Sequence, residues 1–83
     1  MQAILRDRQL NNKINIILDL LDEIEALHPE LNIIFDNTVV NKYSIQIEKL
    51  VCHFTTYKDV IAALNLIGIT ANIVKENNNE KID

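Results

Sequence analysis

The segment from Leu10 to His28, LNNKINIILDLLDEIEALH, constrains the fold more than any other part of this chain. At about 100° of rotation per residue, its apolar residues form two neighbouring stripes on a helix. The first stripe contains Leu10, Ile14, Ile17, Leu18, Leu21 and Ile24, and the second contains Ile16, Leu20 and Leu27. Together they cover roughly half of the circumference, more than the stripe of about 100° that a surface helix needs against one core. We therefore expect the helix to pack on its own domain through one face and on a second molecule through the other.

The second stripe defines a predicted interface. Left in water, each of its aliphatic side chains would forgo roughly 1.5–3 kcal/mol of burial, and contiguous apolar patches often mark interaction surfaces. A chain of 83 residues also buries too little surface to be very stable alone. The predicted partner or dimer interface comprises Ile16, Leu20, Leu27, Asp19 and Glu23. Alternatively, the loop over residues 37–42 folds back over the stripe and covers it.

Alternating residues predict strands in the middle of the chain. The segments 31–36 and 43–48 each alternate with a period of two and are expected to pair as a hairpin. The alternation changes phase at residues 50–54, which a bulge near Lys49 would explain. The same residues also fit a helical period, so a helix over Tyr43 to Phe54 is the competing interpretation.

The second helix is predicted over residues 57–67. Thr56 precedes it as a candidate N-cap, with Asp59 three residues later. Gly68, the only glycine, fits the position after a helix end, where positive φ is free of steric cost. Beyond it, residues 69–74 alternate as a last strand, and residues 2–6 form either a short first strand or the start of the long helix.

These elements predict a small single α+β domain over residues 1–75. Its antiparallel sheet carries two helices on one face in the order β-α-β-β-α-β, a ferredoxin-like arrangement, or α-β-β-α-β without the first strand. Residues 76–83, ENNNEKID, are expected to be a disordered polar tail, because they bury too little to order themselves. An all-α bundle is the alternative if residues 43–54 are helical.

The chemistry-bearing residues do not form a recognisable catalytic, metal or cofactor site. Cys52 and His53 are adjacent on a predicted strand, so their side chains point to opposite faces. His28, at the end of the long helix, is expected to cap or pack. One glycine cannot form a phosphate-binding loop. We therefore expect no enzyme activity, no cofactor and no metal.

Composition narrows the classes of partner and compartment. A net charge of −4 without a basic run makes nucleic-acid binding improbable. No uninterrupted apolar run reaches the length of a membrane span, and a single cysteine suits a reducing cytoplasm.

The sequence therefore predicts a small cytoplasmic interaction protein that binds a protein partner and self-associates as a homodimer through the long helix. Inhibitors, immunity proteins and adaptors, including those that phages and plasmids encode, have this size and this lack of catalytic residues. The alternative is a regulatory domain that binds a small ligand at a subunit interface, with Thr70 and Asn72 among its polar contacts.

Overall fold

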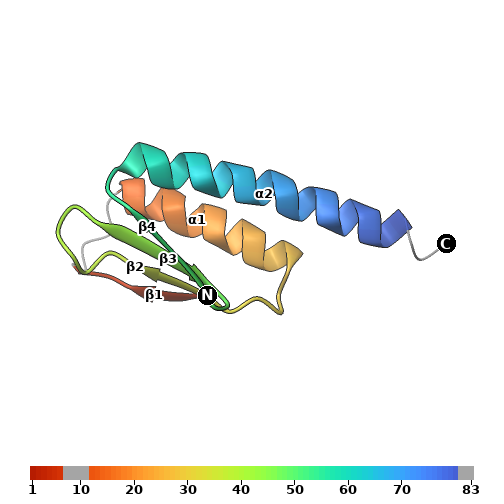
Figure 1. The fold of residues 1–83 in the computed structure, drawn as a ribbon, viewed down its shortest axis with the longest axis horizontal. Helices are drawn as coiled ribbons and strands as arrows, with labels where there is room; N and C mark the ends of the chain where they lie inside the picture. The colour runs from red at the N-terminus through yellow and green to blue at the C-terminus, as the bar shows by residue number, and fades with distance from the viewer. Residues whose placement is uncertain (7–11, 81–83) are drawn as a thin grey trace.

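The computed structural model describes residues 1–6 and 12–80, which form a four-stranded sheet with two helices on one face (Figure 1). The elements are β1 (Gln2–Ile4), α1 (Asn12–Leu27), β2 (Ile33–Asp36), β3 (Tyr43–Ile47), β4 (Leu50–Phe54) and α2 (Tyr57–Glu80). The α+β class is confirmed. The all-α alternative is wrong, because the region from Tyr43 to Phe54 forms strands. Leu10, the expected start of the first helix, lies outside the described residues.

The sheet is mixed, with the strand order β1-β2-β3-β4. The predicted first strand and the predicted hairpin are confirmed, since β1 forms and β2 pairs antiparallel with β3. The expectation of an antiparallel, ferredoxin-like sheet is wrong, because β1 and β2 are direct parallel neighbours. Parallel neighbours need a crossover connection, and α1 provides it.

The predicted last strand over residues 69–74 is also wrong, because α2 continues without interruption to Glu80. Gly68 lacks positive φ and lies within this helix. Val60, Leu64 and Ala71 are buried along one side of α2, so the helical period continues past Gly68. Helix α2 includes residues 76–80 of the segment expected as a polar tail, and residues 81–83 lie outside the described part of the chain.

Local hydrogen bonds explain where α2 begins. The Asp59 amide donates to Thr56 Oγ1 at 3.2 Å, which confirms Thr56 as the N-cap.

A two-residue turn, rather than a bulge, causes the change of phase near Lys49, because Ile47 pairs directly with Leu50. Glu48 occupies this turn at φ 56°. Its amide donates to Asn32 O at 2.9 Å, and its carboxylate accepts from the Asn32 amide at 3.0 Å. These bonds hold a non-glycine residue in the left-handed region.

The core lies between the sheet and the two helices. The first stripe of α1 faces it, as the sequence predicts: Ile17, Leu21 and Ile24 are buried. They belong to one cluster with Phe35 from β2 and Val60 from α2. Burial of this continuous apolar cluster is the main stabilising contribution. The face of the sheet opposite the helices is not covered by any described element (Figure 1).

Candidate partner-binding surface

Helix α2 exposes an apolar side that points away from the core. We define the α2 seam as Ala62, Leu66, Ile69 and Ile73. The exposed fractions of its three large side chains are 66% for Leu66, 59% for Ile69 and 52% for Ile73. In Figure 1 the C-terminal part of α2 extends beyond α1 and the sheet, so no described element lies over it.

Sequence reasoning missed the α2 seam because it ended the second helix at Ile67. The predicted strand over residues 69–74 separates Ile69 and Ile73 from Leu66. The signal was nevertheless present, because the four seam residues follow one another at intervals of four, three and four positions. That spacing places side chains on one face of a helix.

Beside the seam, α2 borders an open groove of about 440 Å³, which we call the α2 groove. Aliphatic residues of α2 form one wall, including Leu66, Ile67 and Val74. Leu31, from the segment after α1, and Ile47, from β3, line it opposite. Val74 is 42% exposed at this position, so the apolar lining is accessible from solvent. The groove can receive aliphatic side chains from another molecule.

The polar groups at the groove already have partners. His28 Nε2 lies 3.3 Å from the Ala71 carbonyl oxygen, and Nδ1 lies 3.2 Å from Glu30 Oε1. The Ala71 carbonyl and the ionised Glu30 carboxylate can only accept hydrogen bonds. A ring nitrogen donates only when it carries a proton, so both contacts are hydrogen bonds at once only when both ring nitrogens carry protons. The Thr70 hydroxyl donates to the Leu66 carbonyl at 2.9 Å. His28 thus joins the end of α1 to α2, in agreement with its expected packing role.

The carboxylate of Glu30 is stabilised in its ionised form. A hydrogen bond from its own backbone amide holds the pKa of Glu30 below the ordinary value, and His28 lowers it further.

The structure separates the residues of the sequence-predicted interface. Ile16 is 46% exposed on α1, and the acidic residues Asp19 and Glu23 are also exposed. Leu20 and Leu27 are instead half-buried, and together with Glu23 they line a hollow of about 190 Å³ between α1 and α2. In the second stripe, Ile16 therefore faces solvent, whereas Leu20 and Leu27 face α2. Its role as an interface stays a prediction, and the loop over residues 37–42 does not line this hollow.

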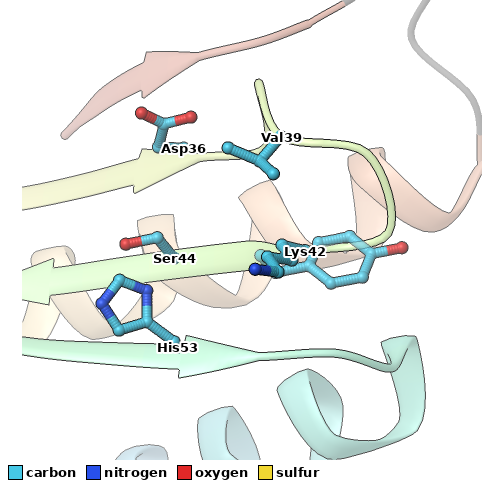
Figure 2. Close-up of a pocket in the computed structure, with 6 residues that line it drawn as sticks. Asp36, Val39, Lys42, Ser44 and His53 are labelled. Carbon is cyan, nitrogen blue, oxygen red and sulfur yellow. The ribbon is translucent and has the colours of Figure 1, made fainter.

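A polar row crosses the uncovered face of the sheet (Figure 2). Asp36 on β2 pairs in register with Ser44 on β3, which pairs with His53 on β4. With Val39 and Lys42 from the connection between β2 and β3, they line a hollow of about 310 Å³. The sequence does not predict that these residues lie side by side, because the register between neighbouring strands cannot be read from the residue pattern within one strand.

The polar row lacks the order that nucleophilic catalysis needs. A catalytic triad places histidine between serine and the carboxylate, whereas Ser44 lies between Asp36 and His53. Asp36 Oδ1 instead accepts from the Thr38 hydroxyl at 2.6 Å and from its amide at 2.8 Å. Within residues 1–6 and 12–80, no three His, Cys, Asp or Glu side chains gather closely enough to hold a metal ion. Cys52 belongs to the opposite face of the sheet, as the sequence predicts.

Helix α2 is also apolar enough, by length and composition alone, to span a membrane over Tyr57–Glu76. However, Val60 and Leu64 of this helix are buried in the core of the domain, so part of its apolar character is used for folding.

Comparison with known proteins adds no family to these observations: no family model, curated protein or solved structure matches this chain. The function is therefore argued from the surface itself.

Proposed function

We propose that this protein is a non-enzymatic binding protein whose α2 groove receives apolar side chains of a partner protein. The observation that carries the proposal is the open aliphatic lining of the groove, in which Leu66 and Val74 are 66% and 42% exposed beside the half-buried Leu31 and Ile47. Apolar surface left in water forgoes about 25 cal/mol per Å² of burial. Exposed contiguous apolar surface in a soluble domain usually marks an interaction site.

A protein partner suits the groove better than a small ligand does. Small-ligand sites usually enclose the ligand and provide several free polar groups that orient it. Here His28 and Thr70 already hydrogen-bond within the chain, and the groove is open. Asn72, the other polar group expected to contact a ligand, lines the hollow between α1 and α2 instead. A small apolar ligand is the second candidate, because about 440 Å³ falls within the volume range of such sites.

The charge of the chain indicates the character of the partner. The net charge is −4, and Asp19, Asp22 and Glu23 form an exposed acidic group on α1. Acidic charge outside an apolar contact speeds association with a basic surface and repels an acidic one. We therefore propose a partner with basic residues around an aliphatic anchor, bound in the cytoplasm. An inhibitor, immunity protein or adaptor acts in this way, by occupying the surface of its target.

The test compares the wild-type protein with the double variant Leu31→Lys/Val74→Lys. Each form carries an affinity tag in the cells that produce it naturally, and mass spectrometry quantifies the bound proteins. Val39→Lys is the matched control, because Val39 is 58% exposed and lies away from the α2 groove. Circular dichroism verifies that all three forms fold.

We expect one protein in near-equimolar amount with the wild type and the control, and its loss with the double variant. Equal recovery with all three forms would show that the groove is not the binding site. A small molecule that co-purifies with the wild type, without an equimolar protein, would support the second candidate instead.

A further inference from the structure

We propose that the α2 seam is the contact between two copies of this chain, packed as an antiparallel dimer about a two-fold axis. Leu66 borders both surfaces, but Ile69 and Ile73 of the seam do not line the α2 groove, so substitutions at these two positions test this inference apart from the proposed function. Leu66, Ile69 and Ile73 each expose more than half of their surface there, at 66%, 59% and 52%. They alternate at intervals of three and four residues, the spacing at which two helices interlock side chains.

The seam is complementary to itself. A two-fold axis between Leu66 and Ile69 places Leu66 of one copy opposite Ile69 of the other. The same axis places Ala62 opposite Ile73, so a small side chain leaves room for a large one. A two-fold interface requires this kind of self-matching surface.

Charge favours the antiparallel direction. Lys58 and Glu76 are exposed and lie about five full helical turns apart, so they flank the same side of the seam. Neither forms an ion pair among the described residues. In the antiparallel dimer each Lys58 falls near Glu76 of the other copy, which gives two opposite-charge contacts. In a parallel dimer Lys58 and Glu76 would lie at opposite ends of the helix pair, so neither of these contacts would form.

Helix α1 is less suited to self-association than α2. Its exposed residues Asp19, Asp22 and Glu23 would face the same acidic residues of a second copy. Ile16 alone among the predicted interface residues of α1 is a large exposed aliphatic. A single helix pair buries less than the ~1,600 Å² of a standard interface. We therefore expect a dimer that depends on protein concentration.

The test is sedimentation velocity of the full chain over a wide range of concentrations. Ile69→Lys places a charge in the centre of the seam and should raise the dissociation constant about tenfold or more. Ile73→Ser should act in the same direction and provides a second variant if Ile69→Lys does not fold. Val74→Lys, on the groove side, is the matched control and should leave the dimer unchanged.

A charge exchange tests the direction of packing. Lys58→Glu should weaken the dimer about three- to tenfold, and Lys58→Glu/Glu76→Lys should restore it. In a parallel dimer neither change would matter, so insensitivity to both would overturn the antiparallel arrangement.

Other outcomes overturn the proposal as a whole. A wild-type protein that is monomeric at every concentration would do so, as would a dimer that tolerates Ile69→Lys.

Flotation with phosphatidylcholine–phosphatidylglycerol vesicles tests whether lipid, rather than a second copy, covers the seam. A chain that floats with the vesicles but stays monomeric in solution would show that lipid, not a second copy, covers the seam. Loss of the dimer in Ile69→Lys with unchanged partner capture would separate this inference from the proposed function.

Discussion

Replacing Gly68 with alanine tests the continuity of α2. Gly68 lies within the helix without positive φ, and a Cβ atom built there meets no atom within 4 Å beyond its chain neighbours and the backbone of its own helix. Glycine in a helix interior is less favourable than alanine by about 0.5–1 kcal/mol, through backbone entropy. Because no clash offsets this gain, Gly68→Ala should raise the free energy of unfolding by about 0.5–1 kcal/mol.

The competing interpretation predicts the opposite sign. If the helix ended at Ile67 and Gly68 adopted positive φ after it, a Cβ atom would cost roughly 1–2 kcal/mol. A continuous helix and a helix that ends at Ile67 therefore predict opposite signs for the change in the free energy of unfolding caused by Gly68→Ala.

Urea and thermal unfolding, followed by far-ultraviolet circular dichroism, measure that quantity. For a domain of this size, about 1 kcal/mol corresponds to a Tm shift of about 4–8 °C. Ala62→Gly, at an exposed position of the same helix, is the matched control and should lower stability by about 0.5–1 kcal/mol. Both are compared at concentrations where the wild type is monomeric. A loss of stability in Gly68→Ala would refute the uninterrupted helix.

Three further predictions follow from individual contacts. Leu20→Lys should lower the free energy of unfolding by about 1–3 kcal/mol in urea titrations, because Leu20 packs against the core cluster; unchanged stability with loss of a dimer would support the interface predicted on α1 instead. Glu48→Gly should be more stable than Glu48→Ala by about 1 kcal/mol, because both lose the acceptor for the Asn32 amide but only alanine keeps the strain of φ 56°; equal stability would contradict the left-handed turn. The hydroxyl and then the amide of Thr38 hold the pKa of Asp36 below its ordinary value of 3.8, so the carboxylate stabilises the fold above that pH and the contribution disappears as pH falls through the folded-state pKa. Carbon-detected NMR titration should give a midpoint for Asp36 below 3.8 in the wild type and a higher one in Thr38→Val; identical midpoints would contradict this cause.

Local patterns in the sequence determined much of the fold. The first stripe of α1 identified Ile17, Leu21 and Ile24 as core residues, and period-two alternation identified the strands that became β2 and β3. Thr56 marked the start of α2 through its hydroxyl. Each of these features depends on residues within a few positions of one another, which is why a single chain displays them.

The tertiary structure decided how these elements meet and where they end. Pairing of β1 beside β2, and of Asp36 with Ser44, depends on strand register across the sheet. Gly68 is compatible with a helix end and with a helix interior; in the structure the helix continues to Glu80, and Ala71 is buried while Ile69 and Ile73 are exposed, as a helix requires and a strand does not. The same continuation creates the α2 seam and brings Leu20 and Leu27 against α2. Solvent exposure of a stripe depends on which other element lies over it, and no period within one segment contains that information.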